Sequence, residues 1–362
     1  MASARKPQPD DPGPDALVVP TADGLYCRAG GFHIDPWRKV DRALITHAHS
    51  DHARQGCGTY LTAASGTGVL QERVGRDAAI EGLPFGEKTT LHEVTVSFHP
   101  AGHLLGSGQI RLAYRGEVWV ISGDYKTAPD PSCEAFEPVP CDVFITESTF
   151  GLPIYRWPEP ASVFADINRW WRRNREVGLT SVVYAYSLGK AQRVLCGLDP
   201  AIGPIGVHGA VNRFLPHYRA VGIRIPDTLH ANRETAPDLK GRGLIVAPGS
   251  SAGTPWLRRF SPHSDAFASG WMAVRGARRW RGLDRGFVLS DHADWPGLID
   301  TINATGAERI GVTHGSCQPM VRWLRENGRA AWEVPTRYTG ETRDAAEEEP
   351  DEEAGDSEKS AS

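Results

Sequence analysis

Several absences narrow what this chain of 362 residues can be. It has no uninterrupted apolar stretch long enough to span a bilayer, which excludes a membrane-spanning helix. The polar, proline-rich start of the chain lacks the apolar core of a secretory signal, so we expect a cytoplasmic protein with a disordered N-terminal tail over residues 1–15. No fixed-period repeat and no heptad pattern is present, which excludes a solenoid and a coiled coil.

Cysteine is scarce as well. The chain has 6 cysteines and none stand in a C-x-x-C pair, which argues against a zinc knuckle and a redox dithiol. In a reducing cytoplasm we expect free thiols, most of them buried. The apolar share of 40% and the charged share of 23% are ordinary for a globular protein, and the length suits about two domains.

Excess charge of one sign is confined to the C-terminal end. Residues 344–362 hold nine acids and one base, a net charge of −8, so the rest of the chain carries −4 minus −8, or +4. We expect residues 341–362 to form an acidic disordered tail, and the mildly basic remainder is compatible with a polyanionic substrate. The basic clusters at 169–173 and 275–281 suit either a nucleic-acid patch or helix faces with solvated arginines and core-facing tryptophans.

Two kinds of sequence pattern divide the remaining chain into two regions. Up to residue 155, β-branched runs bounded by turn residues predict strands, with one helix at 63–74; the strands are expected at 43–45, 94–98, 110–114, 118–122 and 143–146. From residue 156, strands alternate with helical patterns, which is typical of a parallel α/β sheet. Here we expect helices at 160–176, 190–196 and 211–219 and strands at 181–186, 205–207 and 244–247. The last part predicts strands at 286–290 and 309–313, and helices at 295–303 and 319–326.

The strongest chemical signal follows the first of these strands, in the motif H-x-H-x-D-H. His47, His49, Asp51 and His52 place four ligand-type side chains within six residues. Burying three imidazoles and a carboxylate side by side without partners would cost much free energy, so a core role is disfavoured. A loop at a strand end can direct the first pair to one metal ion and the second pair to another. Imidazole and carboxylate ligands suit zinc or manganese better than calcium.

One short motif cannot complete two metal shells. Candidates for the missing ligands stand at the ends of later predicted strands, namely His103, Asp124 and His314. Polar residues that leave several strands at one edge of a sheet are the usual construction of an α/β site.

These seven residues together resemble the metal-ligand motifs of the metallo-β-lactamase superfamily. The resemblance implies that His47, His49 and His103 hold one metal, that Asp51, His52 and His314 hold the other, and that Asp124 bridges them. It also matches Asp35, in Gly31–Asp35, to an early aspartate of the family that orients the site through hydrogen bonds.

The separation of Asp124 and His314 points to one branch of this superfamily. They lie 190 residues apart, which implies an inserted domain and is similar to the β-CASP group of nucleases. Three segments resemble that group's motifs: Thr146–Gly151 with Glu147, Ser290–Asp294 with His292, and Val312–Gly315 with His314. The expected fold is an α/β metallo-β-lactamase αβ/βα sandwich, in two parts at 16–155 and 286–340, with an α/β β-CASP-type domain inserted at 156–285.

Such a site permits phosphodiester hydrolysis. Two metals about 3.5–4 Å apart can clamp a phosphate oxygen and bring the pKa of a water towards ~7. The leaving oxygen still needs a proton, and His292 is suited to supply it, with Glu147 accepting a hydrogen bond from its ring. We therefore take His292, Glu147, Asp51 and Asp124 as the catalytic residues.

Two loops of the insert are candidate contacts for a nucleic-acid backbone. Ser187, Lys190 and Gln192 open a helix after a strand, where backbone N–H groups can bind a phosphate. A capped helix start with a surface lysine explains them equally well. Ser250 and Ser251 lie in a glycine-containing loop that allows close approach.

The span from 16 to 340 is similar to bacterial ligase-associated DNA exonucleases. The stretches Gly24–Cys27, Ile34–Arg38, Ser122–Thr127, Thr149–Pro153 and Gly189–Arg193 carry this similarity. It implies a DNA exonuclease in repair, partnered by an ATP-dependent DNA ligase and a helicase. RNA 3′-end processing is the alternative, because the motif that contains His314 usually has histidine in RNA-acting members of the group.

Two other classes remain as alternatives. A small-molecule metallo-hydrolase is disfavoured by the inserted domain and by the pairing of His292 with Glu147. A metal-free scaffold is disfavoured because the chain keeps all seven ligand residues.

Overall fold

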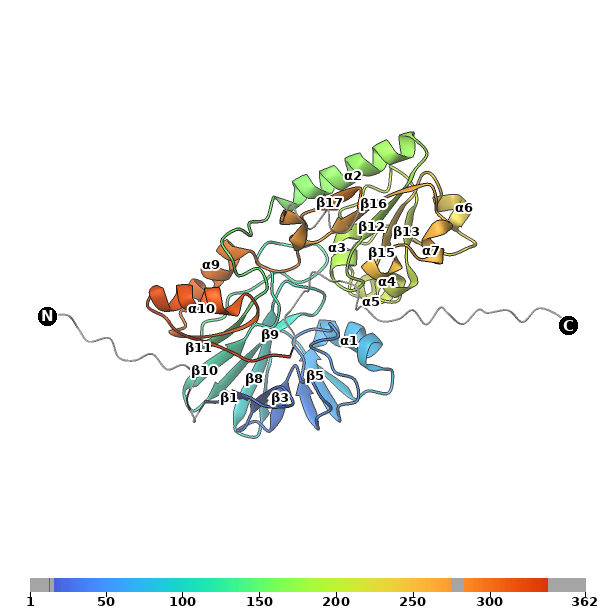
Figure 1. Ribbon diagram of the computed structural model, residues 1–362. Coiled ribbons are helices and arrows are strands. Elements are labelled where there is room, and N and C mark those ends of the chain that lie inside the picture. Colours follow the sequence, from blue (N-terminus) through green and yellow to red (C-terminus); the bar gives the residue numbers. More distant parts are fainter. Residues whose placement is uncertain (1–12, 14–15, 275–282, 338–362) are drawn as a thin grey trace.

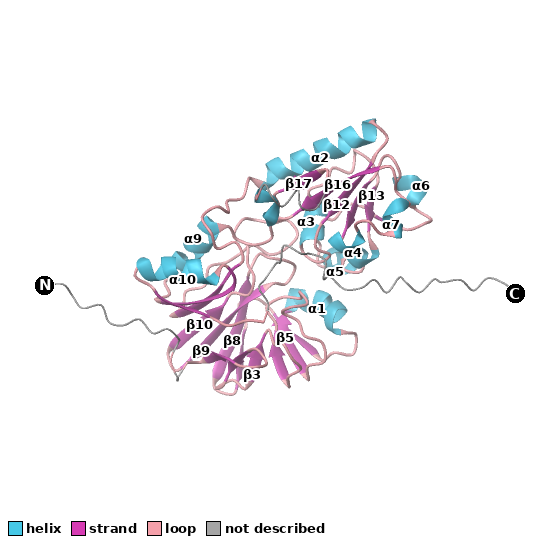
Figure 2. Cartoon of the chain, viewed as in Figure 1, coloured by secondary structure: helices cyan, strands magenta, loops and turns pink. Residues whose placement is uncertain are grey.

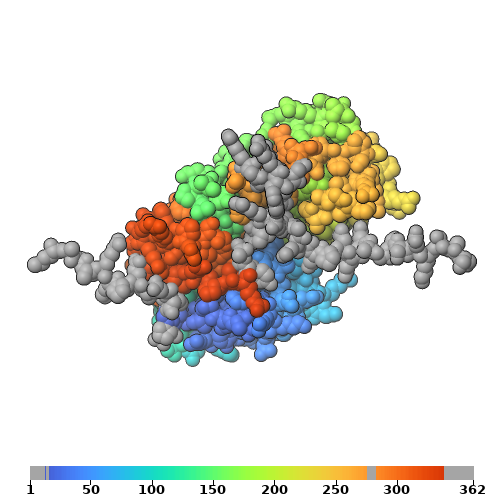
Figure 3. Space-filling view, viewed as in Figure 1, coloured from blue at the N-terminus to red at the C-terminus, as the bar shows by residue number. Residues whose placement is uncertain are grey.

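The computed structural model describes residue 13 and residues 16–274 and 283–337. Apart from residue 13, the two predicted tails lie outside these described residues. The basic cluster at 275–281 and the following residue 282 lie outside them as well. Within them the chain forms three sheets, two of which face each other in one lobe while the third lies in a second lobe (Figure 1). The same division is visible at the molecular surface (Figure 3).

The first sheet is built from the N-terminal strands, which neighbour one another in chain order. Its strands are β1 (Val18–Pro20), β2 (Leu25–Cys27), β3 (Phe32–Ile34), β4 (Arg42–Leu44), β5 (Thr59–Ala63) and β6 (Ile80–Leu83). The helix predicted at 63–74 is confirmed, with a 3₁₀ turn η1 (Ala64–Gly66) leading into α1 (Thr67–Val74).

The second sheet combines segments from both ends of the folded chain. Its order is β19-β18-β11-β10-β9-β8-β7, with β7 (Lys88–Leu91), β8 (Val94–Pro100), β9 (Gly108–Tyr114), β10 (Glu117–Ile121), β11 (Val143–Ser148), β18 (Arg309–Gly315) and β19 (Ala330–Glu333). The strands β10, β11, β18 and β19 run parallel, so their carboxyl ends meet at one edge. Side chains placed just after these strands are therefore brought together although they are far apart in sequence.

The apolar clusters show that this lobe has four layers. One cluster fills the space between the two sheets, with Phe32, Phe98 and Trp119 fully buried. The outer face of the second sheet packs against α9 (Trp295–Thr305) and α10 (Cys317–Glu326), and the outer face of the first packs against α1 (Figure 2). The sequence determines both ends of α9. Asp294 caps its first turn, and Gly306, with a φ of 69°, ends the helix.

The second lobe is a parallel sheet with helices on both faces. Its order is β14-β13-β15-β12-β16-β17, with β12 (Thr180–Tyr184), β13 (Ile205–Val207), β14 (Leu229–His230), β15 (Leu244–Ala247), β16 (His263–Ala268) and β17 (Arg285–Phe287). Every strand pairing in this sheet is parallel, as the alternation of strand and helix patterns in the sequence predicted. Its helices are α2 (Pro160–Glu176), α3 (Lys190–Cys196), α4 (Gly209–Asn212), α5 (Leu215–Ala220), α6 (Ala236–Leu239) and α7 (Pro255–Arg258), with the 3₁₀ turns η2 (Gly249–Ser251) and η3 (Gly270–Ala273).

Two expectations for this lobe need correction. The single helix expected at 211–219 is divided into α4 and α5, because Pro216 has no N–H to continue the helical hydrogen bonds. The strand expected at 286–290 is shorter, and as β17 it pairs with β16 of the third sheet. Phe287 and Leu289 pack into the core of the second lobe, so the predicted boundary between 285 and 286 falls inside one of its strands.

None of the helices in the described part of the chain has the length and apolar content that a membrane crossing needs.

Candidate metal centre

Four strand ends supply the predicted metal ligands. The H-x-H-x-D-H loop follows β4, His103 follows β8, Asp124 follows β10, and His314 lies near the end of β18. Gly123 allows Asp124 to approach the loop, since its φ is 57° and a Cβ there would lie 2.6 Å from the Cβ of Thr46. The seven residues meet at one edge of the sandwich.

The first ligand group contains three imidazoles and one carboxylate. The Nδ1 atom of His49 lies 3.2 Å from the Nε2 atom of His47 and 3.2 Å from the Nε2 atom of His103. In a tetrahedral zinc site with Zn–N bonds of about 2.0–2.1 Å, two ligand nitrogens lie about 3.3 Å apart. The spacing of these nitrogens therefore fits a common metal ion.

The second ligand group shares its carboxylate with the first. The Oδ2 atom of Asp124 lies 3.5 Å from the Nε2 atom of His52 and 3.6 Å from that of His47. Its Oδ1 atom lies 3.2 Å from the Nδ1 atom of His314. Asp51 completes the group, with its Oδ2 atom 3.6 Å from the Nε2 atom of His52. One carboxylate thus lies between two sets of nitrogen ligands.

Hydrogen bonds on the far side of each ring fix which nitrogen faces the centre. Two backbone carbonyls can only accept, so His49 donates from Nε2 to Leu188 O at 3.0 Å, and His103 donates from Nδ1 to Asp291 O at 2.8 Å. The nitrogens that face the centre therefore carry lone pairs. Lone pairs this close repel one another unless a cation lies among them.

Asp35 orients the loop from behind. Its carboxylate accepts hydrogen bonds from the N–H of Thr46 at 2.8 Å and from its hydroxyl at 2.6 Å. The same carboxylate lies 2.7 Å from the Nδ1 atom of His52, which leaves the Nε2 atom of that ring facing the centre. The hydroxyl of Thr46 in turn lies 3.1 Å from the Nδ1 atom of His47. Asp35 therefore lies behind the ligand loop and holds both Thr46 and His52 by hydrogen bonds.

The charges of the site also fit a cation. Burial lowers the pKa of His103 to about 3 and also lowers the pKa values of His47 and His49, so these rings are neutral. For His52 burial acts in the same direction, but the carboxylates around it outweigh burial and raise its pKa well above the usual value. The Nε2 atom of His52 is buried with no hydrogen-bond partner. A divalent cation would satisfy both this nitrogen and the surrounding carboxylates.

A second pair of side chains lies beside the ligands. The Nδ1 atom of His292 is 2.9 Å from the Oε2 atom of Glu147 and 3.0 Å from the Oε1 atom, and its ring centroid is 4.7 Å from that of His103. Burial would lower the pKa of His292, but the Glu147 carboxylate outweighs it and raises this pKa to about 10. The Glu147 carboxylate thus favours the protonated form of His292, which lies next to the metal-ligand candidates.

A pocket opens beside the second ligand group. Asp51, His52 and His314 form part of its wall, together with Asp35 and Trp37. The remaining lining is mostly apolar and comes from the space between the two sheets. The half-buried Asp51 therefore reaches an opening of the sandwich.

The predicted contacts in the insert divide by exposure. Ser250 is exposed, whereas Ser187, Lys190, Gln192 and Ser251 are buried. Gln192 caps its own helix, accepting from the N–H of Gly189 at 2.7 Å and donating to Ser187 O at 2.9 Å. Ser251 donates to Pro248 O at 2.7 Å. A direct contact of these residues with nucleic acid stays a prediction.

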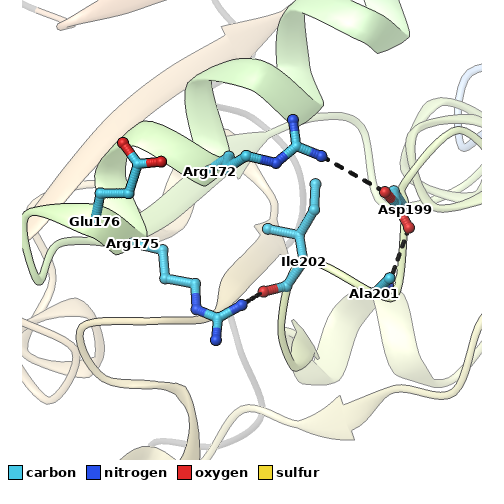
Figure 4. Close-up of a pocket in the computed structure, with 6 residues that line it drawn as sticks. All are labelled: Arg172, Arg175, Glu176, Asp199, Ala201 and Ile202. Atoms are coloured by element: carbon cyan, nitrogen blue, oxygen red, sulfur yellow. Dashed lines mark hydrogen bonds and ion pairs between the residues drawn. The ribbon is translucent and has the colours of Figure 1, made fainter.

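The basic cluster at 169–173 forms part of α2 rather than a continuous patch. Trp170 and Trp171 are buried in the lobe, which favours the helix-face interpretation. Arg172 lies 3.7 Å from Asp199 across a pocket of about 340 Å³, and Arg175 donates to Ile202 O in the same pocket (Figure 4). Carboxylates therefore offset part of the positive charge on this face.

Sequence reasoning named Lys190 only as a candidate contact for a nucleic-acid backbone, and it missed the buried ion pairs that Lys190 and Arg193 form. Lys190 forms an ion pair with Asp291, and Arg193 forms one with Asp130. The position of Asp291 directly before His292 indicated that Asp291 lies near the site, but the sequence did not show that it pairs with Lys190 on α3.

Several known proteins are similar to this chain over part of their own length. No family model matches the chain. A protein of Opitutus terrae described as a probable DNA ligase is 30% identical over 319 residues, which cover 87% of this chain and 31% of that protein. A ribonuclease of Thermus thermophilus is 28% identical over 196 residues, covering 45% of this chain and 44% of that protein.

A third relative is the cleavage and polyadenylation specificity factor 73 of Drosophila melanogaster, 27% identical over 188 residues, which cover 46% of this chain and 27% of that protein. The chain thus spans between 27% and 44% of the length of these three relatives. A solved structure of an Enterococcus faecalis protein of unknown function shares the fold, with a TM-score of 0.55 and 11% identity over 82% of this chain and 80% of that one. The predicted fold class is confirmed.

Proposed function

We propose that this chain, which belongs to the β-CASP nucleases of the metallo-β-lactamase superfamily, is a metal-dependent nuclease that hydrolyses phosphodiester bonds. One observation carries the proposal above the others. The Asp124 carboxylate lies between two sets of imidazole ligands, and the His292–Glu147 pair lies next to them. A two-metal site beside a protonated imidazole suits phosphodiester hydrolysis better than it suits a metal-free scaffold.

The ligand roles follow from the two groups. We assign His47, His49 and His103 to one ion, Asp51, His52 and His314 to the other, and Asp124 to both. When bound, two such ions, zinc or manganese, would bring the pKa of a water towards neutrality and stabilise charge on a phosphoryl oxygen.

His292 provides the proton for the leaving oxygen in this proposal. Its Nδ1 atom is engaged by the Glu147 carboxylate, which raises the pKa of the ring, so Nε2 is the atom that donates. The N–H of Tyr125 donates to Glu147 Oε1 at 2.8 Å and holds that carboxylate in place. Among the predicted contacts with a nucleic-acid backbone, Ser250 is the exposed residue, so its contact needs no rearrangement of the inserted domain.

We favour DNA as the substrate and exonucleolytic repair as the role. The relative described as a probable DNA ligase matches most of this chain within about a third of its own length, which supports association of this nuclease with an ATP-dependent DNA ligase. RNA processing is the second candidate, supported by the ribonuclease relatives and by histidine at position 314. The helicase partner and the cytoplasmic location stay predictions.

The test uses one purified preparation and two substrates of the same sequence. Single-stranded DNA and RNA, labelled in turn at the 5′ and 3′ ends, are incubated with the protein and Mn²⁺ or Zn²⁺. We expect metal-dependent release of nucleotides from DNA, with no release by chelator-treated protein. Faster loss of RNA would assign the protein to RNA processing. Absence of cleavage of both substrates by metal-loaded protein would contradict the nuclease proposal.

A further inference from the structure

We propose that Lys190 and Arg193 on α3 are positioning residues for the metal centre. They hold the segment 290–292 in place and, through it, the ligand His103 and the imidazole of His292. In its kinetic part this inference rests on the proposed nuclease function, whereas its metal-binding part does not.

The Lys190 side chain is internal. It is fully buried, and its Nζ atom lies 3.0 Å from the Oδ1 atom of Asp291, which is buried as well. Its ammonium group also lies 4.7 Å from the centroid of the Tyr186 ring. A buried ammonium group is stable only with such a partner, so this pair fixes Asp291 against the start of α3.

Asp291 transmits this constraint to a metal ligand. Its backbone carbonyl accepts the hydrogen bond from His103 Nδ1 at 2.8 Å, and this bond selects the tautomer whose Nε2 atom faces the ligand group. Only one residue separates Lys190 from Leu188, whose carbonyl acts in the same way on His49 at 3.0 Å. The start of α3 thus orients two of the three imidazoles in the first ligand group.

Arg193 holds the other end of the same segment. It donates from Nη1 to Ser290 O, and its Nε atom lies 2.9 Å from the Oδ2 atom of Asp130 in the sandwich. The hydroxyl of Ser290 accepts from the N–H of His292 at 3.1 Å. The guanidinium group therefore joins the sandwich to the segment that presents His292.

The packing at Gly189 distinguishes this role from direct phosphate binding. Its φ is 88°, and a Cβ there would lie 3.2 Å from Leu104 Cβ and 3.5 Å from Asp291 Oδ2. The start of α3 therefore lies directly against the sandwich and against Asp291. A phosphate between Lys190 and Asp291 would have to displace a carboxylate from a fully buried ion pair.

The experiment compares Lys190→Met and Lys190→Arg in the full chain. Zn²⁺ affinity is measured by competition with a chromogenic chelator, and the ligand field is measured by the absorption spectrum of Co²⁺-loaded protein. We expect Lys190→Met to lose about 10–100-fold in Zn²⁺ affinity, the usual effect of removing a group that orients ligands. Its Co²⁺ spectrum should change, and Lys190→Arg should recover most of both properties. With metal saturating, kcat for a labelled oligonucleotide should fall while KM stays unchanged.

Asn174→Ala provides the matched control. Asn174 is buried in the same lobe and donates to Ser181 Oγ at 2.9 Å, far in sequence from the metal ligands. It should lower the thermal stability of the protein without altering Zn²⁺ affinity or the Co²⁺ spectrum. An equal loss of Zn²⁺ affinity in this variant would show that general destabilisation is responsible and would overturn the inference.

The remaining outcomes are also decisive. Unchanged Zn²⁺ affinity and Co²⁺ spectrum in Lys190→Met, with a raised KM, would make Lys190 a substrate ligand and overturn the inference. If Lys190→Met does not fold, Asp291→Asn removes the ion pair but keeps the carbonyl, and unchanged Zn²⁺ affinity there would overturn it. If the parent protein cleaves no nucleic acid while Lys190→Met loses Zn²⁺ affinity, the positioning role stands and the nuclease proposal alone fails.

Discussion

The metal centre and the pocket on the outer side of α2 both combine carboxylates with nitrogen-bearing side chains, but they differ in burial. At the centre, Asp124 and His52 are buried, and the Nε2 atom of His52 has no hydrogen-bond partner although it lies 3.5 Å from the Oδ2 atom of Asp124. In the outer pocket, Arg172 and Asp199 are about half exposed and neutralise each other. The comparison teaches that burial without internal compensation, rather than the number of charges, identifies a cation site.

The sharpest way to break this comparison is Asp124→Ala. Because this carboxylate lies between both ligand groups, we expect the variant to retain neither metal and to show nuclease activity at background. Metal content by mass spectrometry after gel filtration checks the expectation. Retention of two ions per chain would show that the shared carboxylate does not hold the centre together.

His292→Ala separates proton donation from metal binding. We expect kcat to fall by roughly 10²–10⁴-fold, the usual share of a general acid, while the metal content stays intact. Single-turnover cleavage at saturating metal measures the loss. A variant that has lost its metal would show that His292 serves the ligands rather than the leaving group.

Asp35→Asn tests the support of the ligand loop. The amide cannot accept hydrogen bonds on both of its terminal atoms, so the contacts with Thr46 and His52 cannot all persist. We expect metal affinity to weaken by about 10–100-fold, measured by chelator competition. Unaltered metal affinity would show that Asp35 does not orient the metal ligands.

Glu147→Gln should move the alkaline limb of the pH profile. The acid form of His292 is required, and its pKa is raised to about 10, so the rate should fall as the pH rises towards that value. Without the carboxylate this pKa drops by about 1–3 units, and the fall should begin at lower pH. The dependence of kcat on pH, with metal saturating, tests this. An unchanged alkaline limb would mean that another group donates the proton.

The smallest effect is expected in the outer pocket. Arg172→Ala removes an exposed ion pair, so the free energy of unfolding should change by only about 0–1 kcal/mol, with cleavage unaffected. Urea denaturation and the oligonucleotide assay provide the two measurements. A large loss of cleavage would show that this face takes part in function after all.

The candidate ligands could be proposed from the sequence because each of them directly follows an apolar strand or stands at its end. The H-x-H-x-D-H loop after β4 and the Gly-Asp after β10 are local patterns, and a local pattern is what a sequence displays. The helices α2 and α3 were predicted at their observed bounds for the same reason, namely a regular spacing of apolar residues.

The sequence could not reveal features that depend on distant partners. The pairing of Lys190 with Asp291 joins two segments that only the folded sheet brings together. A surface lysine at a helix start and a buried lysine in an ion pair look alike in a sequence. The predicted domain boundary between residues 285 and 286 was wrong for a similar reason, because the sequence of a strand does not show which sheet the strand will join.

The position of β17 has a mechanical consequence. The chain leaves the third sheet at Phe287 and reaches His292 through the short irregular segment 288–291. The His292 ring is thereby connected to the third sheet on one side and, through Glu147 in β11, to the sandwich on the other. The position of the proposed proton donor is therefore set by both lobes.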